Sequence, residues 1–218
     1  MSRVHRAYSN DYPSVTTILG VLRKPGLEHW FKMNSLKFIT NATNKGKTIG
    51  TQTHEAIEDY INTGKAKVES EYPDEVINAL NSFMLFKKEN SQFELKLSEK
   101  ALVHETYKYN GTIDAPNPPD LLDWKTSECK KLDKPPIYDE WKYQVSAYVH
   151  LWNHNNPDRL IDKAHIVAIA KDKVAYNLYT IYEEEINDLF NQVFLPCLNI
   201  LKYQKERHFY GKPVAVNS

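Results

Sequence analysis

Two acids and one lysine lie close to a single turn in the stretch from Gly111 to Thr126, which reads GTIDAPNPPDLLDWKT. Apolar residues before Pro116 and again from Leu121 predict two strands, and the proline-rich segment between them predicts a turn. We therefore expect a β-hairpin here, with acidic and basic side chains on both of its strands.

Alternate side chains of a strand share a face, so Asp123 and Lys125 are expected to point the same way. Leu122 and Trp124 then pack on the opposite side. Pairing within the hairpin would bring Asp114 beside Asp123. Two carboxylates that repel one another are hard oxygen ligands, suited to Mg²⁺ or Mn²⁺.

Such a metal can polarise a phosphoryl oxygen and lower the pKa of a bound water, while Lys125 positions that water or offsets negative charge. The chemistry suggested is phosphodiester hydrolysis. The pattern D-x-K is short, and the alternative is a surface hairpin with an ordinary Asp/Lys pair.

Length and composition favour one domain. The 218 residues are 41% hydrophobic and 26% charged, enough for one sizeable core. We expect a single domain over 1–218, with 1–90 mostly helical and guiding substrate, 91–182 forming the sheet core, and 183–218 forming a closing helix and tail. No apolar run could span a bilayer and no signal segment is visible, so a cytoplasmic protein without a membrane partner is expected.

Two cysteines are too few for an iron–sulfur cluster held by four thiolates, so no such cluster is expected. The formal net charge is zero. Any nucleic-acid site must therefore be a local basic surface offset by acids elsewhere.

Hydrophobic periodicity predicts the elements around the hairpin. Helices are expected from Ser14 to Leu22, from Leu27 to about Asn41, from Thr48 to Asn62, from Pro73 to Lys88, from Tyr138 to Trp152 and from Glu183 to Arg207, with a polar link at Asn41–Lys47. Further strands are expected at Phe93–Leu97, Ala101–Tyr109, Lys163–Ala170 and Val174–Ile181. This order predicts a mixed α/β fold, a central mixed sheet flanked by helices with an amino-terminal helical region.

Three further groups are candidate functional residues. His54 and Glu58 share a helix face; His54 could ligate metal and Glu58 could orient its ring, or the two could form a surface hydrogen bond. Glu99 is a third acid near the hairpin, or else a solvated turn residue. Gln144 and Tyr148 also lie one turn apart and could hold a phosphate, or form a partly buried polar pair.

Basic and aromatic side chains alternate in the second helical stretch. Bases of a single strand could stack there while lysines contact phosphates. The alternative is an amphipathic helix with its aromatic rings in the core. The residues concerned are Trp30, Phe31, Lys32, Lys37 and Phe38.

Four motifs occur in the order typical of one family, and the sequence resembles the RecB-type branch of the PD-(D/E)XK nuclease superfamily. They are G-x-x-x-H at Gly50 and His54, G-x-x-D at Gly111 and Asp114, D-x-K-T at Asp123–Thr126, and Q-x-x-x-Y at Gln144 and Tyr148. Within that branch it is most similar to the mitochondrial genome maintenance exonuclease group, through PSVT at 13–16, HETxxYxG at 104–111 and DWKTSE at 123–128.

The resemblance implies a restriction-endonuclease-like core and a metal-dependent exonuclease that acts on single-stranded DNA in replication, recombination or repair. It implies Mg²⁺ or Mn²⁺ as cofactor and single-stranded DNA as partner, with a recombination or replication protein as a further open partner. No transit peptide is evident, which favours a phage or bacterial homologue over a mitochondrial one. Alternatives are an exonuclease that resects duplex ends and a non-catalytic nucleic-acid-binding module.

Residue by residue, the resemblance assigns two sets of roles. The metal ligands would be His54, Asp114, Asp123 and, with a looser match, Glu99. The catalytic set would be Asp114, Asp123, Lys125, Gln144 and Tyr148, the last two as phosphate or substrate contacts.

Overall fold

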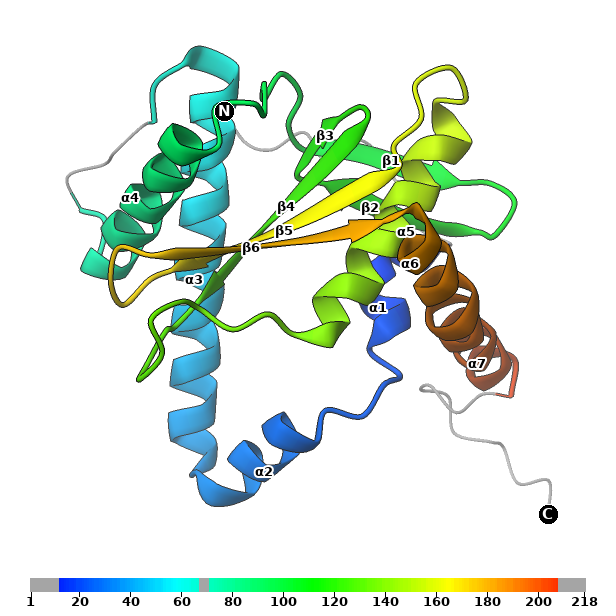
Figure 1. Ribbon diagram of the computed structural model, residues 1–218. Coiled ribbons are helices and arrows are strands. Elements are labelled where there is room, and N and C mark those ends of the chain that lie inside the picture. The colour runs from blue at the N-terminus through cyan, green and yellow to red at the C-terminus, as the bar shows by residue number, and fades with distance from the viewer. Residues whose placement is uncertain (1–11, 67–70, 208–218) are drawn as a thin grey trace.

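A four-stranded sheet with helices on both faces forms the centre of the computed structural model, which describes residues 12–66 and 71–207 (Figure 1). Its strand order is β3-β4-β5-β6. Strand β4 runs antiparallel to β3 and parallel to β5, and β6 runs antiparallel to β5. The predicted mixed sheet is confirmed. The strands are β3 (Ala115–Asn117), β4 (Asp120–Ser127), β5 (Lys163–Ala170) and β6 (Tyr176–Tyr182).

The predicted hairpin is also confirmed. Ala115 pairs with Leu122 and Asn117 pairs with Asp120 across the turn between β3 and β4. A second, two-stranded sheet precedes it, formed by β1 (Lys100–His104) and β2 (Tyr109–Ile113). Asp114 alone separates β2 from β3, so this acid lies where the chain passes from one sheet to the other.

Helices α3 (Leu36–Thr63) and α4 (Asp74–Glu89) pack on one face of the central sheet. The other face is covered by α5 (Asp139–Asn155), with α1 (Val15–Leu19) and the carboxyl-terminal helices beyond it (Figure 1). Those last helices are α6 (Glu183–Leu189), the π-helical turn η1 (Phe190–Phe194) and α7 (Leu195–Glu206). They follow one another without a gap and match the predicted closing helix.

Alternation along β4 divides the core into two clusters. Leu122 and Trp124 belong to the cluster under α3 and α4, where the Trp124 ring centroid lies 5.3 Å from that of Phe83. Leu121 belongs to the cluster around α5. Full burial of a side chain such as Phe83 stabilises the fold by roughly 1.5–3 kcal/mol, so the register of β4 is strongly fixed.

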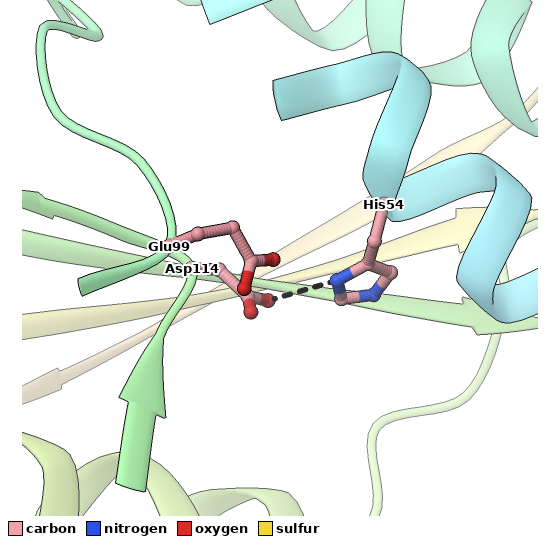
Figure 2. A group of neighbouring side chains, drawn as sticks. All are labelled: His54, Glu99 and Asp114. Atoms are coloured by element: carbon pink, nitrogen blue, oxygen red, sulfur yellow. Dashed lines mark ion pairs between the residues drawn. The ribbon is translucent and has the colours of Figure 1, made fainter. Parts of the chain in front are cut away.

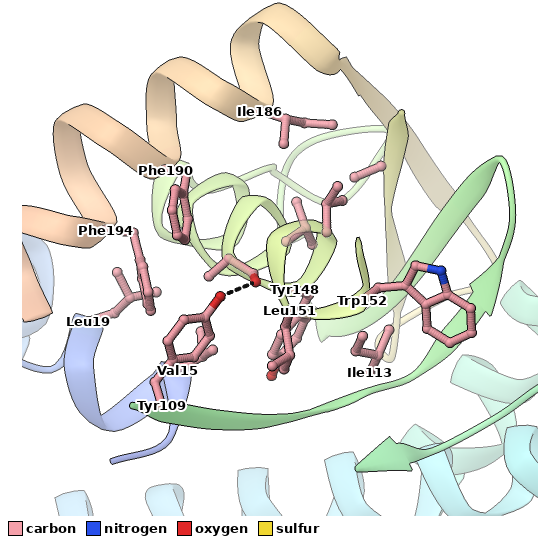
Figure 3. Packing of buried hydrophobic residues seen from close by; sticks show 14 of the residues in the cluster. Val15, Leu19, Tyr109, Ile113, Tyr148, Leu151, Trp152, Ile186, Phe190 and Phe194 are labelled. Carbon is pink, nitrogen blue, oxygen red and sulfur yellow. Dashed lines mark hydrogen bonds between the residues drawn. The ribbon is translucent and has the colours of Figure 1, made fainter. Parts of the chain in front are cut away.

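The cluster around α5 surrounds the turn that carries Ala147 and Tyr148 (Figure 3). The Tyr109 hydroxyl donates a hydrogen bond to the carbonyl of Ala147 at 3.0 Å. Strand β2 is thereby tied to α5 through a buried polar contact, which also fixes the rotation of the helix about its axis.

The break expected between the first two helices is present but shifted, because α1 ends at Leu19 and α2 (Pro25–Met33) begins at Pro25. The helix expected from Leu27 to about Asn41 is wrong in its extent, since it is interrupted at 34–35 before α3 begins. The expected polar link at Asn41–Lys47 is helical, within the 28 residues of α3. Its side chains are mostly exposed and include no proline, so a solvated helix can pass through them. Gly64, at φ 74°, ends this helix as expected.

The strand expected at Phe93–Leu97 is wrong as well, because that segment pairs with no strand among the described residues. Its apolar side chains are instead packed against the two core clusters: Phe93 stacks on Phe86, with ring centroids 6.0 Å apart. The strand expected at Ala101–Tyr109 is divided by a tight turn in which Lys108 has φ 63°.

Parts of two expectations lie outside the described residues, namely the carboxyl-terminal tail after 207 and the first eleven residues. Within the described segments, no helix combines the length and apolar character needed to cross a membrane.

The absence of a side chain at Gly111 makes room for Tyr148. A Cβ atom at this position would lie 2.7 Å from Tyr148 Cε1, closer than such atoms approach one another, and 3.2 Å from Leu151 Cδ2, which is a tight contact. Two motif residues, from β2 and from α5, are therefore in direct contact because one of them is glycine.

We predict that Gly111→Ala destabilises the protein by roughly 1–3 kcal/mol, because the added methyl group overpacks the contact with Tyr148. Gly46→Ala is the matched control: a Cβ atom added there would have no neighbour within 4 Å, and alanine favours a helix. Urea denaturation of both variants would measure the difference. If the two variants were equally stable, the Tyr148 ring would have to shift away from the added methyl group at no cost, contrary to this prediction.

Candidate metal site

Three side chains of metal-ligand type converge beside the hairpin. His54 comes from α3, Glu99 immediately precedes β1, and Asp114 lies between β2 and β3 (Figure 2). One ligand atom from each lies within 4.8 Å of the others. His54 Nδ1 is 3.5 Å from Asp114 Oδ2. These segments are separated by long stretches of sequence, so only the fold brings them together.

The backbone around Asp114 fixes its carboxylate. Oδ2 accepts a hydrogen bond from the Trp124 N–H at 2.9 Å, and the Asp114 carbonyl accepts one from the Glu99 N–H, also at 2.9 Å. The acid is thus held between β4 on one side and the start of β1 on the other.

Close packing of α3 on β4 sets the position of His54. Gly50, one turn earlier, faces Thr126: a Cβ atom at Gly50 would lie 3.6 Å from Thr126 Oγ1. This is an ordinary van der Waals distance, so α3 adjoins β4 here and an added Cβ atom would also fit. Glu58 makes no hydrogen bond to His54 in the described part of the chain; the ring is paired with Asp114 instead.

Glu99 has a left-handed backbone, with φ 49°. This conformation is uncommon for a residue with a Cβ and costs about 1 kcal/mol or more. Strain of this kind persists where surrounding contacts impose it, and it is concentrated at functional sites. Here it directs the half-buried Glu99 side chain toward His54 and Asp114 (Figure 2).

Asp123 and Lys125 form an ion pair next to this group, with Lys125 Nζ 2.6 Å from Asp123 Oδ2. The Asp123 side chain is only 1% exposed and that of Lys125 17%. Apart from this ion pair, neither oxygen of Asp123 receives a well-directed hydrogen bond from the described residues. A buried carboxylate with so few donors is costly, and a divalent cation bound beside it would offset that cost.

Burial and neighbouring charges shift the pKa values in this site. Burial raises the pKa of Asp123 to about 6, with the charge of Lys125 opposing and that of Asp114 adding. For Asp114, burial acts in the same direction, but the charge of His54 and its hydrogen bond lower the pKa overall. Burial would lower the pKa of Lys125, yet the charges of Asp123 and Asp114 raise it, so its ammonium form persists.

His54 is subject to the same competition. Burial favours its neutral form, whereas the charge of Asp114 and the hydrogen bond to it favour the imidazolium, and the net pKa is raised. Binding of a cation by the His54 ring would require its neutral form.

The ligand set fits a divalent cation. An imidazole nitrogen with carboxylate oxygens suits Mn²⁺, and the oxygens suit Mg²⁺. The 3.5 Å between His54 Nδ1 and Asp114 Oδ2 is shorter than twice a metal–ligand bond of about 2.1 Å, so one ion can contact both. Asp123 is adjacent but lies outside the converging group, and its role as a ligand stays a prediction.

The phosphate-contact candidates lie on α5. Gln144 Nε2 donates a hydrogen bond to the Tyr148 hydroxyl at 2.9 Å, so the predicted one-turn neighbours are in contact. The same helix presents Glu140, whose charge contributes to the raised pKa of Lys125 after those of Asp123 and Asp114. Glu140 also pairs with Lys24 at 2.7 Å. No motif in the sequence indicated that Glu140 would lie near Lys125.

Comparisons with known proteins carry little weight for this chain. No family model and no curated protein matches it. A phage-related exonuclease from Haemophilus somnus 129PT is similar in structure, at 14% identity over 72% of this chain and 82% of that one, with a TM-score of 0.39. The protein SSO0001 matches at 20% identity over 54% of this chain, with a TM-score of 0.34. The match spans 59% of SSO0001, less than two thirds of its length. At these TM-scores the likenesses carry no argument about activity.

We predict that Mn²⁺ binding weakens several-fold when the pH is lowered from 8 to 6, because protons compete with the cation at His54 and Asp123. The pKa of His54 is raised above its ordinary value and that of Asp123 is raised to about 6, so both groups take up protons more readily as the pH falls. Calorimetric titration in buffers of different ionisation enthalpy would measure affinity and proton release together. Binding that is independent of pH and releases no proton would contradict this ligand assignment.

Proposed function

We propose that this protein is a Mg²⁺- or Mn²⁺-dependent deoxyribonuclease of the RecB-type branch of the PD-(D/E)XK superfamily, acting as an exonuclease on single-stranded DNA. The observation that supports this most is the convergence of His54, Glu99 and Asp114 within 4.8 Å, beside the buried pair of Asp123 and Lys125. A surface hairpin with an ordinary ion pair would not need two acids and a histidine gathered around a buried charge.

His54, Glu99 and Asp114 would hold the cation, with Asp123 adjoining it. When bound, the ion supplies Lewis-acid polarisation of a phosphoryl oxygen and makes a nearby water more acidic. Lys125 remains an ammonium group, so it can orient the attacking water and offset the charge that develops on the phosphate oxygens. Asp123 holds the Lys125 amine in place through the 2.6 Å contact.

Gln144 and Tyr148 would contact the phosphate being cut or its neighbour. Their mutual hydrogen bond leaves the second Gln144 N–H available to a phosphate oxygen. Because the Tyr148 ring packs where Gly111 has no side chain, the position of this pair follows that of β2.

Helix α2 and the first half of α3 would guide the strand toward the site. No side chain of α2 is buried, and α3 has none buried before Ile49. Phe31 and Phe38 are 43% and 53% exposed, so they are available to stack with bases and do not belong to the core. The Trp30 ring centroid lies 5.5 Å from that of Phe31 and 6.1 Å from that of Phe38.

End-labelled single-stranded, blunt duplex and circular single-stranded DNA, each with Mn²⁺ or with EDTA, would test the proposal. We expect metal-dependent shortening of the linear single strand only. Efficient attack on the blunt duplex would favour the resection alternative, and cleavage of the circle would exclude an exonuclease. DNA binding without cleavage in any metal would favour the non-catalytic module.

We predict that Lys125→Ala lowers kcat at least about a thousandfold, because transition-state charge loses its nearest ammonium group. The matched control is Lys163→Ala, which removes a partly exposed lysine from the neighbouring strand. Circular dichroism and Mn²⁺ binding would verify that Lys125→Ala is folded and still holds metal. A kcat within tenfold of wild type would remove the assigned role of Lys125.

A further inference from the structure

A lysine-bearing loop follows directly from the strand that carries Asp123 and Lys125. It occupies 128–138, between β4 and α5 (Figure 1). Its residues Lys130, Lys131 and Lys134 are exposed. The whole chain has a formal net charge of zero, so this is a local concentration of positive charge. None of the roles assigned above uses it.

Hydrogen bonds to the turn between β5 and β6 and to the start of β6 hold this loop in a defined shape. The Asp172 carboxylate accepts from the backbone N–H groups of Cys129 and Lys130, both at 2.9 Å. Lys173 Nζ donates to the Leu132 carbonyl at 2.7 Å, and Asn177 donates to that of Pro135 at 3.0 Å. Lysines on such a loop lose less conformational freedom on binding than lysines on a mobile segment.

Most acids in and beside the loop have an ion-pair or hydrogen-bond partner, whereas the three lysines make no ion pair within the described residues. Glu128 pairs with Lys171 at 3.1 Å, and Asp172 is bound to backbone N–H groups. Among the described residues, Lys130, Lys131 and Lys134 make no ion pair. Asp133 is the one acid of the loop without such a partner in the described chain, so the free charges in this segment sum to a positive value.

The loop begins three residues after Lys125 along the chain, and the charge of its first residue, Glu128, acts on Lys45 of α3. Lys130 is five residues beyond Lys125, so their Cα atoms are at most roughly 18 Å apart, a span of a few nucleotides. On the other side, Lys45 of α3 pairs with Glu75, and the charge of Glu128 adds to the rise in the Lys45 pKa. A strand running from α3 to Lys125 would therefore pass the loop.

We infer that this loop binds consecutive backbone phosphates of the DNA strand on one side of the scissile bond. The inference rests on the proposed nuclease function and adds a second DNA-contact region to it. This region would bind phosphates through charge, independently of the base sequence. Each phosphate neutralised on a single strand contributes about 0.7 to the slope of log K against log salt concentration. The loop should then favour long strands over short ones.

Fluorescence anisotropy in EDTA, where metal-dependent cleavage is suppressed, would test this with labelled oligothymidylates of 20 and 4 nucleotides. Lys131→Ala/Lys134→Ala should weaken binding of the 20-mer roughly tenfold at 0.1 M salt and reduce the salt slope by about 1.4. The loss should be several times smaller for the 4-mer. Lys88→Ala/Lys205→Ala, which removes two exposed lysines from α4 and α7, should match wild type.

The outcomes separate this inference from the proposed function. If wild type cleaves and binds DNA but the loop variant equals the control variant, the loop inference alone is wrong. If both double variants weaken binding equally, overall charge is responsible and the loop has no special role. If wild type neither binds nor cleaves DNA, both proposals fail.

Discussion

A carboxylate buried in the middle of a strand is the constraint from which the rest of the site follows. Asp123 is 1% exposed, and Lys125 is the only cation that contacts it within the described chain. Removing such a pair from water can cost more than the attraction within it returns, and burial raises the pKa of Asp123 to about 6. Stability alone therefore gives little reason for this pair, which agrees with the catalytic role proposed for it.

The candidate metal ligands beside this pair are placed by backbone hydrogen bonds and by packing. Asp114 occupies the single residue between two strands and is held there by the N–H groups of Trp124 and Glu99. His54 reaches it because α3 lies close over β4 at Gly50. Fixed elements of this kind hold ligands more accurately than a loop would, which is the condition for a site that must bind metal and substrate together.

The same fold leaves a large apolar surface outside the core. Leu36 and Met33 are 79% and 70% exposed, beside the aromatic rings of α2 and α3. Exposed apolar patches of this kind commonly mark binding surfaces. Because the core contacts of α3 begin only at Ile49, the first half of this helix and α2 can present these side chains without disturbing the packing around the metal ligands.

The sequence by itself determined the features that depend on local periodicity and on caps. Asp123 shares a face with Lys125, opposite Trp124, because the period of a strand is two. Gly64 ends α3 because glycine adopts a left-handed backbone easily. Only the tertiary structure decided that Glu99 and His54 lie beside Asp114. It also decided that the Tyr148 ring packs where Gly111 has no side chain, and that Phe93–Leu97 packs on the core without pairing with a strand. These features depend on contacts between segments far apart in the chain and on burial, and no local pattern of residues specifies either of them.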